Sequence, residues 1–235
     1  KSRLRKAFEK NELRVHYQPK VSLRDGRIVG AEALVRWELT DRGIVLPSEF
    51  IPLAEESNLI LQIGEWVLDR VCTDYQKWAL TPARPGRVSV NLSLRQLKQR
   101  DFISRVQAIY AKHGVAPDAL ELEITETTLM EDPKRTLHLL HELHRLGLRL
   151  AIDDFGTGYS SLSALQQFPI STLKIDQSFV QNATTDHDQA TIVALIIEMG
   201  HSLKLEVVAE GVESEDQLRF PRSLNCDYAQ CLLFG

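Results

Sequence analysis

Acidic and amide side chains recur at or just after the ends of short apolar runs along this chain. They are Glu32, Asn91, Glu123, Asp153, Asp154 and Glu210. A single acid in such a position is more often a helix cap or a solvated loop residue. A whole set is different, because carboxylates that meet at one place repel each other unless cations neutralise them. The pattern therefore predicts a metal site. Oxygen ligands without cysteine or histidine favour Mg²⁺ or Mn²⁺ over Zn²⁺ as the ion.

One lysine belongs with these acids. Lys174 alternates with the apolar residues Leu173 and Ile175, so in a strand its side chain points to the opposite face from theirs. In a closed barrel that face is the interior, close to the carboxylates. Other polar residues in or just after the apolar runs are Gln18, Arg36, Glu126, Asp176, Glu213 and Gln230.

The elements that position these residues alternate along the 235-residue chain. Strand-like runs cover residues 14–18, 28–37, 87–92, 120–124, 148–153, 172–176, 205–210 and 228–234. Helical patterns between them cover residues 65–78, 94–113, 134–146 and 189–202. Eight strands that alternate with helices predict an α/β fold, the (β/α)8 TIM-like barrel. The carboxyl ends of barrel strands meet at one rim, which would bring the acids together.

One connection departs from this pattern. Only nine residues separate Gln18 from Ile28, and they include Asp25-Gly26, a hairpin turn signal. A parallel crossover needs a dozen or more residues, so we expect an antiparallel first strand pair. The alternative fold is an open Rossmann-type sheet. It is less favoured because Gly156-Thr157-Gly158 lacks the third glycine of the dinucleotide-binding loop.

Composition excludes several classes of protein. Lys and Arg number 28 against 32 Asp and Glu, a net charge of −4, so no cationic surface is available for a nucleic-acid polymer. No apolar run approaches the roughly 20 residues that span a bilayer, so we expect no membrane contact by this segment. Three cysteines, an odd number, indicate reduced thiols and a cytoplasmic protein.

Ordered motifs along nearly the whole chain resemble those of EAL domains, the cyclic di-GMP phosphodiesterases of bacterial signalling. They include Ala31-Glu32-Ala33-Leu34, Val90-Asn91-Leu92-Ser93, Asp153-Asp154-Phe155-Gly156, Leu173-Lys174-Ile175-Asp176 and Ala209-Glu210-Gly211-Val212-Glu213. The family's barrel has an antiparallel first strand pair, which agrees with the hairpin expected here.

The resemblance implies roles for the polar residues. Two Mg²⁺ or Mn²⁺ ions would bind Glu32, Asn91, Glu123, Asp153 and Asp154, with Asp153 between them. The catalytic residues would be Glu32, Lys174 near the attacking water, and Glu210. Contacts to substrate would come from Gln18, Arg36, Asp176, Glu213 and Gln230. Glu126 would steady the loop that follows Asp154.

The activity implied is hydrolysis of cyclic di-GMP to linear pGpG by a water that two metal ions activate. Two alternatives remain: a catalytically silent receptor for cyclic di-GMP, and a barrel hydrolase for another phosphoester. The chain keeps every metal ligand of the family, which favours the enzyme. It departs from the family at Cys231 and Asn225, where glycine is usual.

The resemblance also bears on organisation. We expect residues 1–235 to form a single EAL phosphodiesterase domain, taken from a longer signalling protein and lacking the family's last helix. It further implies a homodimer and an upstream sensory or GGDEF domain.

Overall fold

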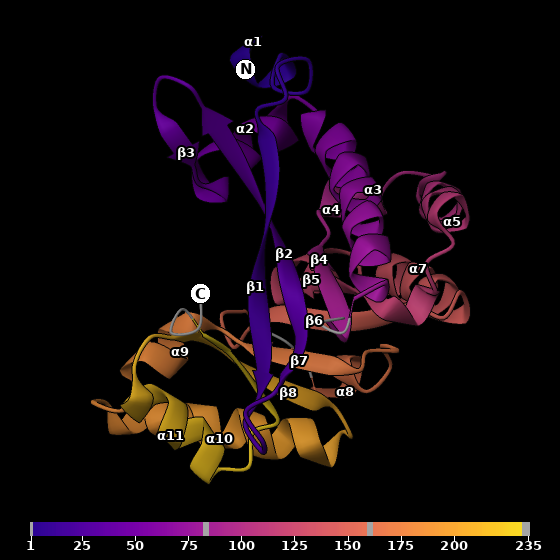
Figure 1. Cartoon of the computed structure of the whole chain (residues 1–235). Coiled ribbons are helices and arrows are strands. Elements are labelled where there is room, and N and C mark those ends of the chain that lie inside the picture. Colours follow the sequence, from indigo (N-terminus) through magenta and orange to yellow (C-terminus); the bar gives the residue numbers. More distant parts are fainter. Residues whose placement is uncertain (1, 82–84, 159–161, 232–235) are drawn as a thin grey trace.

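The computed structural model describes residues 2–81, 85–158 and 162–231 and contains a closed barrel of eight strands (Figure 1). In chain order these are β1 (Leu13–Ser22), β2 (Ile28–Leu39), β4 (Arg87–Asn91), β5 (Leu120–Thr125), β6 (Arg149–Phe155), β7 (Thr172–Ile175), β8 (Glu206–Val212) and β9 (Tyr228–Cys231). The short β3 (Gly43–Val45) pairs with the outer part of β2.

The first strand closes the barrel and runs against its neighbours. β1 pairs antiparallel with β2, which places Gln18 opposite Glu32, and antiparallel with β9, which places Lys20 opposite Gln230. The pairs from β2 and β4 through β8 and β9 are parallel. Gly26 has a φ of 72° in the β1–β2 turn, as a tight hairpin requires. The TIM-like barrel with an antiparallel first pair is therefore confirmed, and the open sheet was the wrong alternative.

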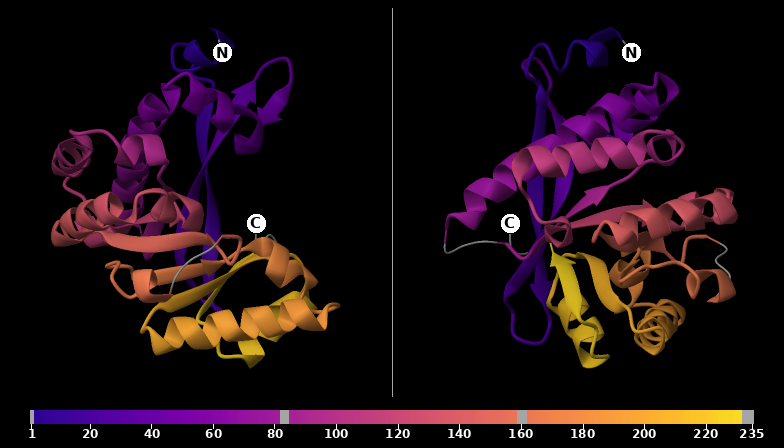
Figure 2. Two further views of the ribbon diagram at one scale, coloured as in Figure 1. Left: turned by 180° about the vertical axis from the view of Figure 1, so that it is seen from behind. Right: turned by 90° about the vertical axis from the view of Figure 1, so that its right-hand side faces the viewer.

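Helices cover the outside of this barrel (Figure 1). The ends of β1 and β2 away from their connecting turn extend beyond it as a twisted two-stranded ribbon toward α1 (Ser2–Arg5) and β3 (Figures 1 and 2). The helices are α1 (Ser2–Arg5), α2 (Pro47–Glu56), α3 (Leu59–Ala79), α4 (Leu94–Leu97), α5 (Phe102–His113), the 3₁₀ turn η1 (Pro117–Ala119), α6 (Glu126–Glu131), α7 (Pro133–Arg145), α8 (Leu162–Leu165), α9 (Gln177–Asn182), α10 (His187–Ser202) and α11 (Glu215–Ser223). Within the described ranges, no helix combines the length and apolar character needed to cross a bilayer.

The structure corrects some element boundaries. The helix expected over residues 94–113 is two helices, because the polar residues 98–101 have no apolar side chain to hold a helical turn against the barrel. The helices α2, α6, α8, α9 and α11 and the strand β3 lie outside the ranges given for expected elements. The last strand was predicted over residues 228–234; β9 covers Tyr228–Cys231, and residues 232–234 lie outside the described part.

Candidate metal and active site

Lys174 on β7 lies at the centre of the site, surrounded by carboxylates from four other strands. Its Nζ lies 2.7 Å from Glu123 Oε2, 2.7 Å from Glu210 Oε1, 3.1 Å from Asp153 Oδ1 and 3.2 Å from Glu32 Oε2. The side chains of Lys174 and Glu123 are fully buried. One ammonium therefore stands among four acidic groups inside the barrel.

Burial and neighbouring charges shift the pKa values of these groups in different directions. Burial and the charge of Glu32 raise the pKa of Glu123 to about 8. Burial also acts to raise the pKa of Glu32, but the charge of Lys174 and hydrogen bonds from Gln230, Lys174 and Asn91 hold it below its ordinary value. Burial acts to lower the pKa of Lys174, but the surrounding carboxylates raise it well above its ordinary value, so the ammonium stays charged.

Side chains from three strands orient the Glu32 carboxylate. Asn91 Nδ2 donates a hydrogen bond to Glu32 Oε1 at 2.6 Å, and Lys174 Nζ donates to Oε2. Gln230 Nε2 donates to the same Oε2 and also to Gln18 Oε1 at 2.9 Å. The carboxylate is thus fixed by β4, β7 and β9, and Gln18 joins the network from β1.

A second group of acids lies at the carboxyl ends of β6 and β8. Asp154 has a φ of 53°, in the left-handed region, and its backbone N–H donates to Asp153 Oδ1 at 3.0 Å. Burial and the charges of Asp153 and Asp176 raise the pKa of Asp154 to about 6. Glu210 completes this group, with one oxygen of each carboxylate within 4.8 Å of the others.

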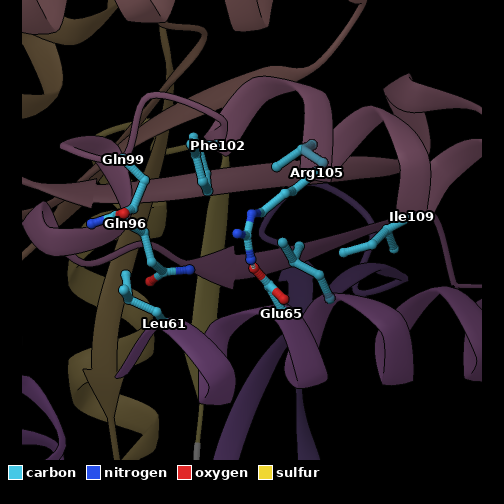
Figure 3. A pocket seen from close by; sticks show the side chains of 9 residues that line it. Leu61, Glu65, Gln96, Gln99, Phe102, Arg105 and Ile109 are labelled. Carbon is cyan, nitrogen blue, oxygen red and sulfur yellow. Dashed lines mark hydrogen bonds and ion pairs between the residues drawn. The ribbon is translucent and has the colours of Figure 1, made fainter. Parts of the chain in front are cut away.

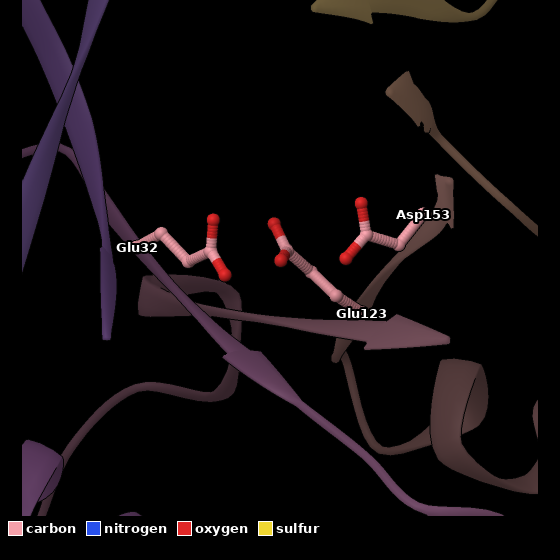
Figure 4. Close-up of side chains that lie close together, drawn as sticks. All are labelled: Glu32, Glu123 and Asp153. Atoms are coloured by element: carbon pink, nitrogen blue, oxygen red, sulfur yellow. The ribbon is translucent and has the colours of Figure 1, made fainter. Parts of the chain in front are cut away.

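The residues present fit hard divalent cations. Two triads of carboxylates have converging oxygens, and Asp153 belongs to both: Glu32, Glu123 and Asp153, drawn in Figure 4, and Asp153, Asp154 and Glu210. Glu123 Oε1 is buried and accepts no hydrogen bond from the described residues. A buried acceptor without a donor is costly, and a cation would satisfy it. Oxygen donors alone are the ligand set that Mg²⁺ or Mn²⁺ prefers.

Glu126 holds the backbone that follows the Asp153-Asp154 pair. It is buried at the start of α6, and its Oε2 accepts hydrogen bonds from Gly156 N at 2.8 Å and Gly158 N at 3.2 Å. A Cβ on Gly158 would lie 3.0 Å from Glu126 Cδ, so the loop is closely fitted to this side chain. Residues 159–161 of the loop lie outside the described part.

The other predicted contact residues lie farther out. Arg36 is half-buried four residues beyond Glu32 on β2, and its Nη1 donates to the carbonyl of Val35 at 3.0 Å. Burial lowers the pKa of the Arg36 guanidinium. Asp176 caps α9 by accepting from Ser178 N at 2.9 Å, close to Asp154.

Glu213 stands apart from the central cluster. It is exposed just beyond β8, and its Oε1 accepts a hydrogen bond from Gln181 Nε2 at 3.1 Å. The structure therefore brings together the predicted metal ligands, Lys174, Glu210, Gln18 and Gln230, whereas Arg36 and Glu213 lie outside this cluster.

Sequence reasoning missed a second polar layer beneath the site. Lys20 Nζ lies 3.0 Å from Glu121 Oε2, which also accepts from Ser89 Oγ at 3.0 Å, and Thr172 Oγ1 donates to Glu121 Oε1 at 2.6 Å. Ser89, Glu121 and Thr172 each precede a central residue of the same strand by two positions. The signal was therefore present as period-two spacing of polar residues, which places both layers on the interior face.

A hollow of about 620 Å³ opens beside Asn91. Apolar side chains make up much of its lining, among them Leu34, Pro47, Ile51, Ile60, Leu92 and Leu94. Two of these, Pro47 and Ile51, lie on the unexpected helix α2, whose start was signalled by proline at its first position. A hollow of this size and character suits an organic ligand with flat, weakly polar parts.

Comparisons with known proteins agree with this architecture. The family model described as "EAL domain" matches residues 1–235. The protein named "Bifunctional diguanylate cyclase/cyclic di-GMP phosphodiesterase MucR" from Pseudomonas aeruginosa is 43% identical over 232 residues, which are 99% of this chain and 34% of that protein. The protein named "Cyclic di-GMP phosphodiesterase NbdA" from the same species is 41% identical over 232 residues, 99% of this chain and 30% of that protein.

The chain therefore spans about a third of the length of these curated relatives. The solved structure titled "PaMucR Phosphodiesterase, c-di-GMP complex" matches with a TM-score of 0.96 and 43% identity, covering 100% of this chain and 95% of that one.

Proposed function

The chain belongs to the EAL domain family, and on this premise we propose that it hydrolyses cyclic di-GMP to linear pGpG with two divalent cations, Mg²⁺ or Mn²⁺. The observation that carries the proposal is the pair of carboxylate triads that share Asp153 at the rim of the barrel. The hollow beside Asn91 gives room for a base of the substrate, and relatives named as cyclic di-GMP phosphodiesterases support the choice of substrate.

The cations would be held by Glu32, Asn91, Glu123, Asp153 and Asp154, with Asp153 shared because it belongs to both triads. When bound, such cations supply an activated water near neutral pH and neutralise charge on the departing oxygen.

The chain's own residues carry the remaining chemistry. The charged ammonium of Lys174 is held in place by four carboxylates, and we assign it to stabilise negative charge as the water attacks phosphorus. Glu210 lies at the edge of this cluster in the second triad, and we assign it to accept the proton of that water. Glu32 combines a ligand role with a fixed orientation from Asn91 and Gln230.

The substrate would be held from the rim. Arg36 has a planar fork that matches two phosphate oxygens, and among the described residues no carboxylate forms an ion pair with it. Gln18 and Gln230 would contact the substrate from the inner side, and Asp176 from the end of β7. The exposure of Glu213 supports at most a contact at the outer edge.

The test is incubation of the protein with cyclic di-GMP in Mg²⁺, Mn²⁺ or EDTA, followed by chromatographic separation of pGpG. We expect pGpG only with metal, and none from Glu32→Ala. Tight binding of cyclic di-GMP without product would instead favour the silent receptor. Turnover of bis(p-nitrophenyl) phosphate but not of cyclic di-GMP would favour a different phosphoester as substrate.

Within a longer signalling protein, we propose that this domain acts as a cytoplasmic homodimer behind a sensory or GGDEF domain. Support for the further domain comes from the greater length of the relatives and from the printed name of MucR, which joins a diguanylate cyclase to a phosphodiesterase. Cys72 and Cys226 are free and buried thiols, which suits a reducing compartment.

A further inference from the structure

Gly64 lies inside α3, five residues after its start, where glycine is about 1 kcal/mol less favourable than alanine. Its φ is not in the left-handed region, so its backbone conformation does not require glycine. The reason is space, because a Cβ on Gly64 would lie 2.0 Å from Gln96 Nε2 and 2.6 Å from Gln96 Cδ. The helix α3 therefore leaves a gap into which the Gln96 amide fits.

The same amide is tied to the start of α4. Gln96 Oε1 accepts hydrogen bonds from Ser93 N at 3.0 Å and Ser93 Oγ at 2.9 Å, and Gln96 N donates to Ser93 Oγ at 3.3 Å. This is a reciprocal capping box. Figure 3 shows the buried Gln96 side chain reaching from α4 toward α3, with its amide between Leu61 and Glu65.

The capping box stands two residues beyond Asn91. On the other side, Leu92 N donates to the carbonyl of Glu123 at 2.8 Å, which ties the end of β4 to β5. The Asn91 side chain donates to Glu32 across the rim. The segment that carries Asn91 is thus held from one side by β5 and from the other by Gln96 against α3.

We propose that Gln96, seated in the gap at Gly64, is a positioning residue that fixes Asn91 at the candidate metal site. It acts through Ser93 and the turn at the end of β4, without contact to the cation. This inference rests on the proposed function, since Asn91 is a ligand only if the site holds metal.

The variants Gly64→Ala and Gln96→Ala test this role together with their double variant. The first expels the amide while it improves the helix propensity of α3, and the second removes the amide. We expect the Mn²⁺ dissociation constant, measured by calorimetry, to rise roughly tenfold or more in each single variant, as for the loss of other groups that orient metal ligands. Both changes break the same contact, so their effects do not add. We expect the Mn²⁺ dissociation constant of the double variant to be no higher than that of the single variant with the higher constant.

Gly200→Ala is the matched control. Gly200 is also a helical glycine, and its Cβ would lie 2.5 Å from Val207 Cγ2, but it has no part in the capping box. This variant leaves Mn²⁺ affinity unchanged. Hydrogen exchange of the amides of residues 92–97 in metal-free protein adds a second readout, and we expect it to be faster in both single variants but not in the control.

The outcomes separate the two proposals. If the wild type binds Mn²⁺ and all variants bind it equally well, the positioning role is wrong and the proposed function stands. Unchanged exchange at residues 92–97 in Gly64→Ala and Gln96→Ala overturns the role as well. If the wild type binds no Mn²⁺, the proposed function and the positioning role both fail.

Discussion

Lys174 Nζ lies 2.7 Å from Glu123 Oε2 at the centre of the barrel, and both side chains are buried. The lysine is the internal cation of a cluster in which Glu123 has a pKa of about 8 and one oxygen that accepts no hydrogen bond from the part of the chain that the structure describes. Four carboxyl groups surround this single ammonium, and burial and the charges of neighbouring carboxylates raise the pKa of Glu123 and of Glu210. This excess of acidic groups over cationic ones suits the divalent cations that we propose for the site.

Replacing Lys174 by methionine removes that internal cation. Loss of one partner from a buried charge cluster costs about 3–5 kcal/mol, so Lys174→Met lowers the free energy of unfolding of metal-free protein by that order. Mn²⁺ then raises the free energy of unfolding more in the variant than in the wild type, because it neutralises the repulsion among the carboxylates that have lost their ammonium. Urea unfolding in EDTA and in Mn²⁺ measures both effects. Lys134→Met, on the surface of α7, is the control. Equal stability of Lys174→Met and wild type in EDTA would contradict this account.

Glu126→Ala tests the tie between α6 and the loop after Asp154. It removes the acceptor for Gly156 N and Gly158 N, so the loop loosens and kcat falls roughly 10- to 100-fold. Hydrogen exchange at residues 155–158 should increase in parallel. Asp216→Ala on α11 removes only an exposed ion pair with Arg219 and leaves both quantities unchanged. Unchanged turnover in Glu126→Ala would show that the loop needs no such tie.

Arg36→Ala tests the phosphate contact at the rim. A charged hydrogen bond contributes about 1.5–3 kcal/mol, so its loss raises KM for cyclic di-GMP roughly 10- to 100-fold. We expect kcat to change little, because Arg36 lies outside the central cluster. Steady-state kinetics give both constants, and Arg27→Ala in the exposed β1–β2 turn is the control. A fall in kcat at constant KM would instead assign Arg36 to the chemical step.

Local sequence patterns predicted the central side chains and the unusual first strand pair. The alternation of Lys174 with Leu173 and Ile175 indicated its inward direction, and Asp25-Gly26 indicated the hairpin. Both features depend on neighbours within a few residues, which is why a single sequence carries them. The grouping of acids at the rim followed from the barrel topology.

The features that were missed depend on distant contacts. The break between α4 and α5 depends on which residues pack against α3 and the barrel. Helical periodicity in the sequence does not predict that packing. The Lys20–Glu121 layer joins residues on β1 and β5 that come together only when β1 closes the barrel. The fit of Gln96 to Gly64 likewise joins two elements that are separate in sequence.

The Lys20–Glu121 layer predicts a contribution to stability that depends on pH. Burial acts to raise the pKa of Glu121, but the charge of Lys20 and hydrogen bonds from Thr172, Lys20 and Ser89 bring it from 4.5 to about 2. Because the pKa of Glu121 is lower in the folded than in the unfolded protein, its ionised form stabilises the folded state. This stabilisation is fully present above pH 4.5 and is lost as the pH falls toward 2.

Urea unfolding at a series of pH values measures this effect. Glu121→Gln lowers stability at neutral pH, and its deficit relative to the wild type shrinks as the pH falls through this range. A deficit that stays constant down to pH 2.5 would contradict the assignment of the low pKa to Glu121.

Hydrolysis of cyclic di-GMP in ¹⁸O-labelled water tests the central claim most directly. Water attacks phosphorus and the bond between phosphorus and the 3′ oxygen breaks. One ¹⁸O therefore enters the 5′ phosphate of pGpG, where mass spectrometry detects it. We expect labelled pGpG from the wild type in Mg²⁺ or Mn²⁺, and none in EDTA or from Glu32→Ala. Saturating binding of cyclic di-GMP with metal present and no labelled product would contradict the account and leave the domain as a receptor.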